Sequence, residues 1–155
     1  MKPYRVSLAL AASAALLALA APAHAHWSFT KWGMTTDQVI KAAKGKARAN
    51  PGTPGDRVMD QDRGASGGPF DFEGRKYMAD FYFDPAGGGL RVVRLNMLDQ
   101  NQCDALGAEL EKRFGPSSNK YHGEWTDPKT GDQVFFSRSY KVMANLACYL
   151  SIKGQ

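Results

Sequence analysis

The stretch FDFEGRKYMADFYF, residues 70–83, decides the fold class of this chain. Apolar and polar side chains alternate on either side of Gly74, and this period of two is typical of half-buried β-strands. A glycine between two such runs is typical of a turn, so the stretch predicts a pair of antiparallel strands. Beyond the turn, one row of side chains is Tyr77, Ala79, Phe81 and Phe83, and the other is Met78, Asp80 and Tyr82.

Further strands are predicted toward the C-terminus. Residues 90–98 alternate in the same way after a glycine-rich turn at residues 84–89. Turn signals in the last third of the chain separate three more apolar runs. These runs predict strands at residues 121–126, 133–138 and 145–152. Stretches rich in glycine and proline predict loops at residues 45–57 and 64–68.

Two helices are expected beside these strands. Thr35 and Gln38 match a capping box, in which each side chain satisfies a backbone amide at a helix start, so we expect a helix over residues 36–44. A second helix is predicted where apolar residues recur at helical spacing, and Gly115-Pro116 ends it. Its apolar face consists of Cys103, Leu106, Gly107, Leu110 and Phe114.

This order of elements predicts an α+β fold. Two helices are expected to pack on an antiparallel β-sheet, in the order helix, strands, helix, strands. Because the order repeats, we consider a tandem of two half-repeats, residues 32–98 and 103–155. The length suits one globular domain over residues 26–155, which is large enough to bury a core.

The N-terminus has the three parts of a secretory signal peptide. A basic start precedes an apolar run over residues 8–21, and Ala23-His24-Ala25 matches the small-residue cleavage site. We therefore expect residues 1–25 to be removed and the mature protein to begin at His26. The run is shorter than the roughly 20 residues that span a bilayer, and no cysteine near the cleavage site could carry a lipid. We expect a periplasmic or secreted protein without a stable membrane anchor.

Cys103 and Cys148 are the two cysteines of the chain. Thiols in an oxidising compartment tend to pair, so the expected export predicts a disulfide between them. Cys103 falls on the apolar face of the second helix and Cys148 on the apolar side of the last strand, so packing the helix on the sheet would bring the thiols together. The alternative, a reactive or metal-binding pair, would need further ligands, and His26 and His122 are the only imidazoles for it.

Charge and motifs argue against several function classes. The net charge of +5 is spread along the chain without a run of Lys and Arg, so we expect neither nucleic-acid binding nor a membrane-surface patch. Residues 64–68 match G-x-S-x-G but lack the strand, turn and helix of a hydrolase. Asp60 and Asp62 lack the ligand and turn positions of a calcium loop. We therefore expect no enzymatic activity and no cofactor.

The residues before the first helix leave two alternatives open. His26 at a new N-terminus would combine a free amine with an imidazole and so chelate copper, or it begins a disordered tail. We expect the tail and no metal site. The aromatic residues Trp27, Phe29 and Trp32 either pack back on the helix as core or form an exposed contact, and we expect core.

Two motifs resemble the SmpA/OmlA, or BamE-like, family. Gly33-Met34-Thr35-Thr36-Asp37-Gln38-Val39 is similar to the helix start of that family, and residues 81–84 with 89–93 are similar to its aromatic strand, turn and following strand. The resemblance covers about residues 32–98. The repeated helix and sheet also resemble the beta-lactamase inhibitory protein-like superfamily. This resemblance implies a non-enzymatic interaction module of the cell envelope.

The sheet side that carries Met78 and Tyr82 is the candidate partner surface. Large apolar side chains there alternate with charged ones and need not be buried. We expect an exported, soluble binding or inhibitor-like protein with a protein partner. The alternative is an envelope-assembly or structural accessory protein of BamE-like type, and charge and composition do not separate the two.

Overall fold

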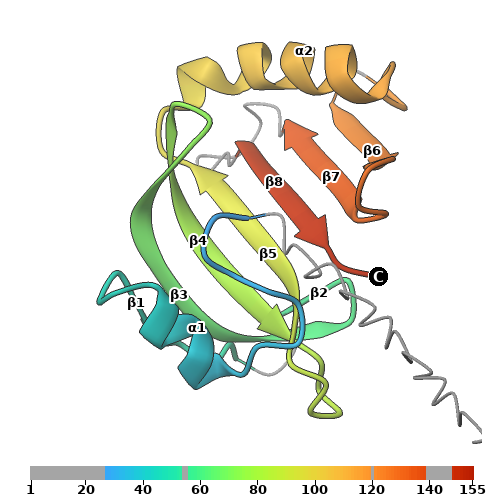
Figure 1. Cartoon of the computed structure of the whole chain (residues 1–155). Coiled ribbons are helices and arrows are strands. Elements are labelled where there is room, and N and C mark those ends of the chain that lie inside the picture. The colour runs from blue at the N-terminus through green and yellow to red at the C-terminus, as the bar shows by residue number, and fades with distance from the viewer. Residues whose placement is uncertain (1–26, 54–55, 120, 139–147) are drawn as a thin grey trace, which may run out of the picture.

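A computed structural model of the whole chain describes residues 27–53, 56–119, 121–138 and 148–155. The described residues form one antiparallel sheet of eight strands with two α-helices (Figure 1). The predicted combination of helices with an antiparallel sheet is therefore confirmed. The expected signal peptide and His26 lie outside the described residues. None of the helices in these ranges is long and apolar enough to cross a membrane.

Helix α1 spans Thr36–Ala42, and it is followed by β1 Ala47–Ala49, β2 Arg57–Val58, β3 Gln61–Phe72, β4 Arg75–Phe83 and β5 Leu90–Met97. A 3-10 helix at Gln100–Gln102 leads into α2, Cys103–Phe114, and the last strands are β6 His122–Thr126, β7 Gln133–Arg138 and β8 Cys148–Lys153. In the sheet the strands lie in the order β1, β3, β4, β5, β8, β7, β6, and β2 pairs with β3 beside this path. The last strand, β8, thus joins the strands before α2 to those after it.

The helix ends follow the local signals in the sequence. The amide of Gln38 donates to the Thr35 hydroxyl at 3.3 Å, and the amide of Thr35 donates to the Gln38 side chain at 2.9 Å, so the predicted capping box is confirmed. Helix α1 ends at Ala42, short of its predicted end. Helix α2 ends as predicted at Gly115, whose amide donates to the Glu111 carbonyl at 2.8 Å.

Two stretches that were predicted as loops contain strands. Residues 64–68 lie inside β3, and residues 47–49 form β1, which pairs with β3. The physical reason is the close approach of the two backbones. A Cβ atom at Gly67 would collide with the backbone of Lys46 and Ala47. Glycine here lets two strands meet and does not mark a flexible loop.

Both helices pack on the same face of the sheet. Val39 of α1 and Leu106 of α2 belong to one buried cluster with the alternate residues of β4, β5, β7 and β8. Figure 1 shows α2 across one end of the sheet and α1 near the opposite end, in front of β3. The two helices therefore cover different parts of one sheet face, and the core lies beneath them.

The N-terminal aromatic residues belong to this core. Trp27 is fully buried, and its ring centroid lies 5.1 Å from that of Phe70 and 5.8 Å from that of Phe81. Phe29 and Trp32 are partly buried against the same cluster. The expectation that this segment packs as core is confirmed, and the segment fills the face between the helices.

The predicted disulfide joins Cys103 to Cys148, with 5.8 Å between their Cα atoms. It connects the first residue of α2 to the first residue of β8. Beside it, the amide of Cys148 donates to the Gln100 side chain at 2.8 Å. One covalent bond and one hydrogen bond thus fix the start of α2 on the end of a central strand.

Candidate functional site

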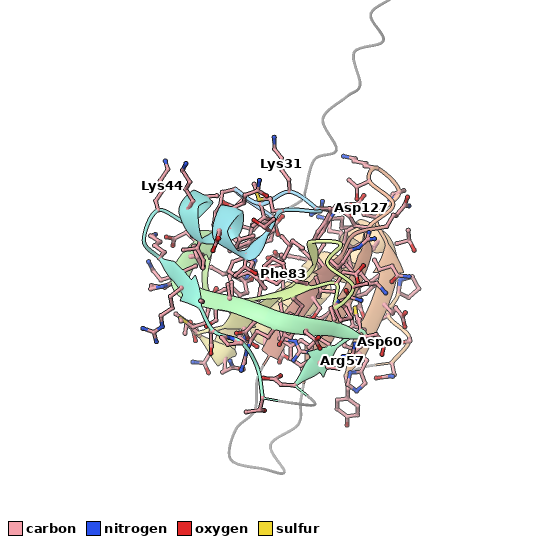
Figure 2. The ribbon with its side chains drawn as sticks, turned by 90° about the horizontal axis from the view of Figure 1, so that it is seen from below. Lys31, Lys44, Arg57, Asp60, Phe83 and Asp127 are labelled. Carbon is pink, nitrogen blue, oxygen red and sulfur yellow. A yellow bond between two sulfur atoms is a disulfide. The ribbon has the colours of Figure 1, made fainter. Side chains whose placement is uncertain are left out.

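The candidate site is the sheet face on which neither described helix packs, and we call it the helix-free face. In Figure 2, α1 and Lys44 lie on one side of β3, and Arg57 and Asp60 of the β2 turn lie on the other. Because successive side chains of a strand point to opposite faces of the sheet, the alternation along each strand shows which residues lie on the helix-free face. They are Met78, Asp80 and Tyr82 on β4, Val92, Arg94 and Asn96 on β5, Tyr149, Ser151 and Lys153 on β8, Phe135 and Ser137 on β7, and His122 and Glu124 on β6.

Five of these side chains form a continuous line across neighbouring strands, which we call the aromatic row. It runs from His122 through Phe135, Tyr149 and Arg94 to Tyr82. The ring centroids of His122 and Phe135 lie 6.1 Å apart, and those of Phe135 and Tyr149 lie 6.2 Å apart. The guanidinium carbon of Arg94 lies 4.5 Å from the Tyr149 centroid and 5.8 Å from the Tyr82 centroid. The row places aromatic and cationic surface in one line.

The strand register explains why these rings meet. Phe135 pairs with Ser151, and Tyr149 pairs with Ser137, so each ring lies diagonal to the next ring and directly opposite a serine. Diagonal neighbours in a sheet are within reach of aromatic and other long side chains. Ser151 is 0 % exposed and Ser137 is 3 % exposed, so the larger side chains cover both serines. The small serines leave the space that the rings occupy.

A group of polar side chains lies beside the row. Asp80 is the Cα partner of Arg94 across the strands, but its carboxylate contacts other groups. Asn96 Nδ2 donates to Asp80 Oδ2 at 2.9 Å, and Arg63 Nη1 lies 3.8 Å from Asp80 Oδ1. Arg63 Nη2 in turn lies 2.6 Å from Asp56 Oδ2. The Asp80 carboxylate is thus occupied by Asn96 and Arg63.

Stacking, and not an ion pair, positions the guanidinium of Arg94. Its Nε donates to the Ser151 hydroxyl at 3.5 Å, which is a long hydrogen bond. Tyr149 and Tyr82 lie against it, and the side chain is half-buried. Within the described ranges, no carboxylate lies at ion-pair distance from Arg94. The terminal nitrogens of this arginine therefore remain free of any described acidic partner.

The structure corrects the prediction for Tyr82. This residue lies on the predicted face but is 1 % exposed, because Val58 of β2 and Val92 of β5 pack against it in a second small cluster. Burial raises the pKa of the Tyr82 hydroxyl above its ordinary value. Met78, the other predicted contact residue, is 39 % exposed. Tyr82 therefore supports the row from within and does not present itself to a partner.

The residues that the sequence analysis weighed as metal ligands are not seen together in the described part of the chain. His122 is exposed and stacks on Phe135, whereas His26 lies outside the described residues. Asp62 pairs with Arg57, whose Nε lies 2.9 Å from Asp62 Oδ1. In the part of the chain that the structure describes, no three His, Cys, Asp or Glu side chains gather closely enough to hold a metal ion.

A cavity of about 140 Å³ lies between α2 and the sheet, on the helix-bearing side. Ion pairs cross its rim. Arg113 Nη1 lies 3.2 Å from Glu73 Oε1, and Arg113 Nη2 lies 3.6 Å from Asp127 Oδ2. Asp127 is labelled in Figure 2. These pairs tie α2 to two turns of the sheet. The apolar walls are Phe72, Leu110, Phe114, Val134, Leu150 and Ile152.

Comparison of the chain with protein-family models, with curated proteins and with solved structures finds no match. Function must therefore be inferred from the chemistry of the site. Three members of the row, Arg94, Phe135 and Tyr149, were not singled out from the sequence. For Arg94 a signal was present, because the alternation of residues 90–98 places it on the side opposite Leu95.

Proposed function

We propose that this protein is an exported, non-enzymatic binding or inhibitor-like protein that engages a protein partner through the helix-free face. The observation that carries the proposal is the aromatic row. His122, Phe135, Tyr149 and Arg94 each contact the next on a sheet face that neither described helix covers. In such a fold the core lies between the helices and the sheet face that they cover, so the opposite sheet face is available to bind a partner.

The residue types of the row are those that dominate protein interfaces. Tyr, Phe and Arg are enriched at the centres of interfaces, and Tyr and Arg carry a large share of the binding energy at hot spots. Phe135 and Tyr149 are half-buried by their neighbours in the row. Side chains that are already held in place lose less conformational entropy on binding, which favours affinity.

The disulfide supports a location outside the cytoplasm, in the periplasm or as a secreted protein. Disulfides persist in oxidising compartments and are rare where thiols are kept reduced. The Cys103–Cys148 bond joins the two layers of the fold, so it fits a protein that matures after export. The signal-like composition of residues 1–25 supports the same location.

The second candidate is an envelope-assembly or structural accessory protein of BamE-like type. Its support is the arrangement of the two halves. Helix α1 precedes the consecutive antiparallel strands β3, β4 and β5, and α2 precedes β6, β7 and β8, with β5 beside β8. We infer a tandem of two half-repeats, residues 32–98 and 103–155, and a repeat of this kind also suits a scaffold between several partners.

Site-specific photo-crosslinking in the producing cells tests the proposed function. A photoreactive amino acid at Glu124 lies exposed on the helix-free face, beside the row. The matched control is the same amino acid at Lys112, which is exposed on α2. A single crosslinked protein at Glu124, and none at Lys112, is the expected result.

Two other outcomes have defined meanings. Crosslinks from Glu124 to several components of one assembly would favour the accessory role over the inhibitor-like role. Equal yields at Glu124 and Lys112, or no product at Glu124 despite folded protein, would contradict binding through the helix-free face. Comparison of the two positions separates specific contact from random collision, because both side chains are exposed to solvent.

A further inference from the structure

We infer that Arg94 is the anchor for a carboxylate of the partner, so that the aromatic row accepts an acidic segment of a protein. This inference rests on the proposed function and specifies the chemistry of the partner. Its basis is that the guanidinium contacts two tyrosine rings while no described carboxylate lies at ion-pair distance from it. Arg94 stands between Tyr149 and the buried Tyr82 in the row.

The carboxylate that could neutralise Arg94 from within the fold is already committed. Asp80 lies directly across from Arg94 in the register, yet its two oxygens contact Asn96 and Arg63. Arg63 is also tied to Asp56 at 2.6 Å. The polar side chains beside the row are therefore paired with one another. The charge of Arg94 is not neutralised within this group and can pair with an external ligand.

Stacking also orients Arg94 for recognition of a carboxylate. A guanidinium is planar, and its N–H bonds lie in that plane, so a ring stacked on it leaves the edges for hydrogen bonds. The ring of Tyr149 is the closer of the two, at 4.5 Å. The long Nε hydrogen bond to Ser151 further limits rotation of the group. Arg94 is thus preorganised for the paired hydrogen bonds that a carboxylate accepts.

The surrounding charge favours an acidic protein segment. Lys153 is the Cα partner of Val92 and therefore lies on the helix-free face. Within the described ranges it forms no ion pair. The chain is basic, and residues 26–155, without Lys2 and Arg5, keep a net charge of +3. Complementary potentials of this kind steer an acidic partner to the surface. A nucleic-acid strand fits less well, because its backbone carries a charge on every nucleotide and calls for several cations in line, whereas Arg94 is the cationic member of the row.

The test is an NMR titration of the disulfide-bonded protein, labelled with nitrogen-15. The probe is a blocked peptide of alternating glutamate and serine, and the matched probe has glutamine in place of every glutamate. We expect the glutamate peptide to shift the Arg94 Nε–H resonance and the amides of Phe135 and Tyr149. The glutamine peptide is expected to bind about tenfold more weakly, because it cannot form charged hydrogen bonds.

Variants of the protein define the role of Arg94. Arg94→Gln is expected to weaken binding of the glutamate peptide about tenfold, and Arg94→Lys to weaken it less, because lysine keeps the charge without the planar fork. Lys112→Gln, on exposed α2, removes a charge elsewhere and should leave affinity unchanged. Melting curves of each variant show that the fold is retained, and Arg94→Lys remains informative if Arg94→Gln does not fold.

Several results would overturn the inference. They are equal binding of the glutamate and glutamine peptides, unchanged affinity of both Arg94 variants, or tighter Arg94-dependent binding of a thymidine oligonucleotide than of the glutamate peptide. Crosslinking from Glu124 distinguishes this failure from failure of the proposed function. If Arg94→Gln and Arg94→Lys both crosslink to the partner as the wild type does, the acidic anchor is wrong and the binding face stands. If the wild type gives no crosslink, the proposed function itself fails.

Discussion

Arg94 on β5 lies over the ring of Tyr149 on β8, with 4.5 Å between the guanidinium carbon and the ring centroid. These residues belong to strands that are far apart in the chain and adjacent in the sheet. Their contact joins the aromatic part of the row to its cationic part. It also places an unneutralised charge at the junction of the strands before α2 and those after it.

The burial of Tyr82 predicts that its loss affects stability. Tyr82→Ala removes a side chain that is packed against Val58 and Val92, so we expect a loss of about 3 kcal/mol in the free energy of unfolding. Met78→Ala, on the same strand and 39 % exposed, should cost about 0.5 kcal/mol or less. Urea denaturation of the two variants measures the difference, and equal stabilities would show that Tyr82 is not part of a core.

The disulfide is expected to make a large contribution to stability. The bond links residues with a sequence separation of 45, so it restricts the unfolded chain strongly. Replacing both Cys103 and Cys148 with alanine should lower the free energy of unfolding by about 2–4 kcal/mol. The comparison uses urea denaturation of oxidised wild type and the double variant. An unchanged midpoint, or two free thiols in protein from the exported fraction, would contradict this account.

The ion pair between the buried Arg75 and the exposed Glu109 predicts how stability changes with pH. Both terminal nitrogens of the buried Arg75 donate to the Glu109 carboxylate, at 2.9 and 2.6 Å, and this hydrogen bonding lowers the pKa of Glu109 below its ordinary 4.5. A lowered folded-state pKa means that the carboxylate stabilises the fold above the unfolded pKa, and this contribution is lost as pH falls through the folded pKa.

Glu109→Gln tests this pair directly. At neutral pH the variant should lose about 1 kcal/mol, because Arg75 loses its charged partner while Glu109 itself is largely exposed to solvent. Below the ordinary carboxylate range the stability difference between wild type and variant should shrink. Urea denaturation over a pH series measures it. A difference that stays constant on acidification would show that the Glu109 charge does not stabilise the fold.

Gly67 is expected to be intolerant of a side chain. A Cβ there would meet the backbone of Lys46 and of Ala47, where β1 begins, and a backbone cannot move aside as a flexible side chain could. Gly67→Ala should therefore cost about 2 kcal/mol or more. Gly74→Ala is the control, because nothing lies within 4 Å of its Cβ position and only its φ of +75° adds about 1 kcal/mol. Thermal denaturation showing equal losses would argue against the tight β1–β3 contact.

Local signals in the sequence predicted much of the fold. The capping box at Thr35 and the glycine at the end of α2 act within one turn of helix, so neighbouring residues suffice to recognise them. The alternation in residues 70–83 likewise predicted a pair of strands and the face on which Tyr82 lies. The disulfide was predictable because both cysteines stand at apolar positions of such regular elements.

The misses have long-range causes. The β1 strand forms because Gly67 admits a second backbone, and composition alone gives glycine the appearance of a loop. Tyr82 is buried because the short β2 strand folds over it, which no periodicity in β4 reveals. The aromatic row depends on the register of β5, β7 and β8, and the pairing of β5 with β8 joins residues more than fifty positions apart, such as Arg94 and Ser151.

The affinity of the crosslinked partner for row variants tests the central claim most directly. Tyr149→Thr keeps a strand-forming residue but removes the ring that Arg94 stacks on. Calorimetric titration with the purified partner should show a loss of about 2 kcal/mol, roughly thirtyfold in affinity, with little change in the melting temperature. Lys112→Ala on α2 should bind as the wild type does. Unchanged affinity of folded Tyr149→Thr, or an equal loss in both variants, would contradict binding through the aromatic row.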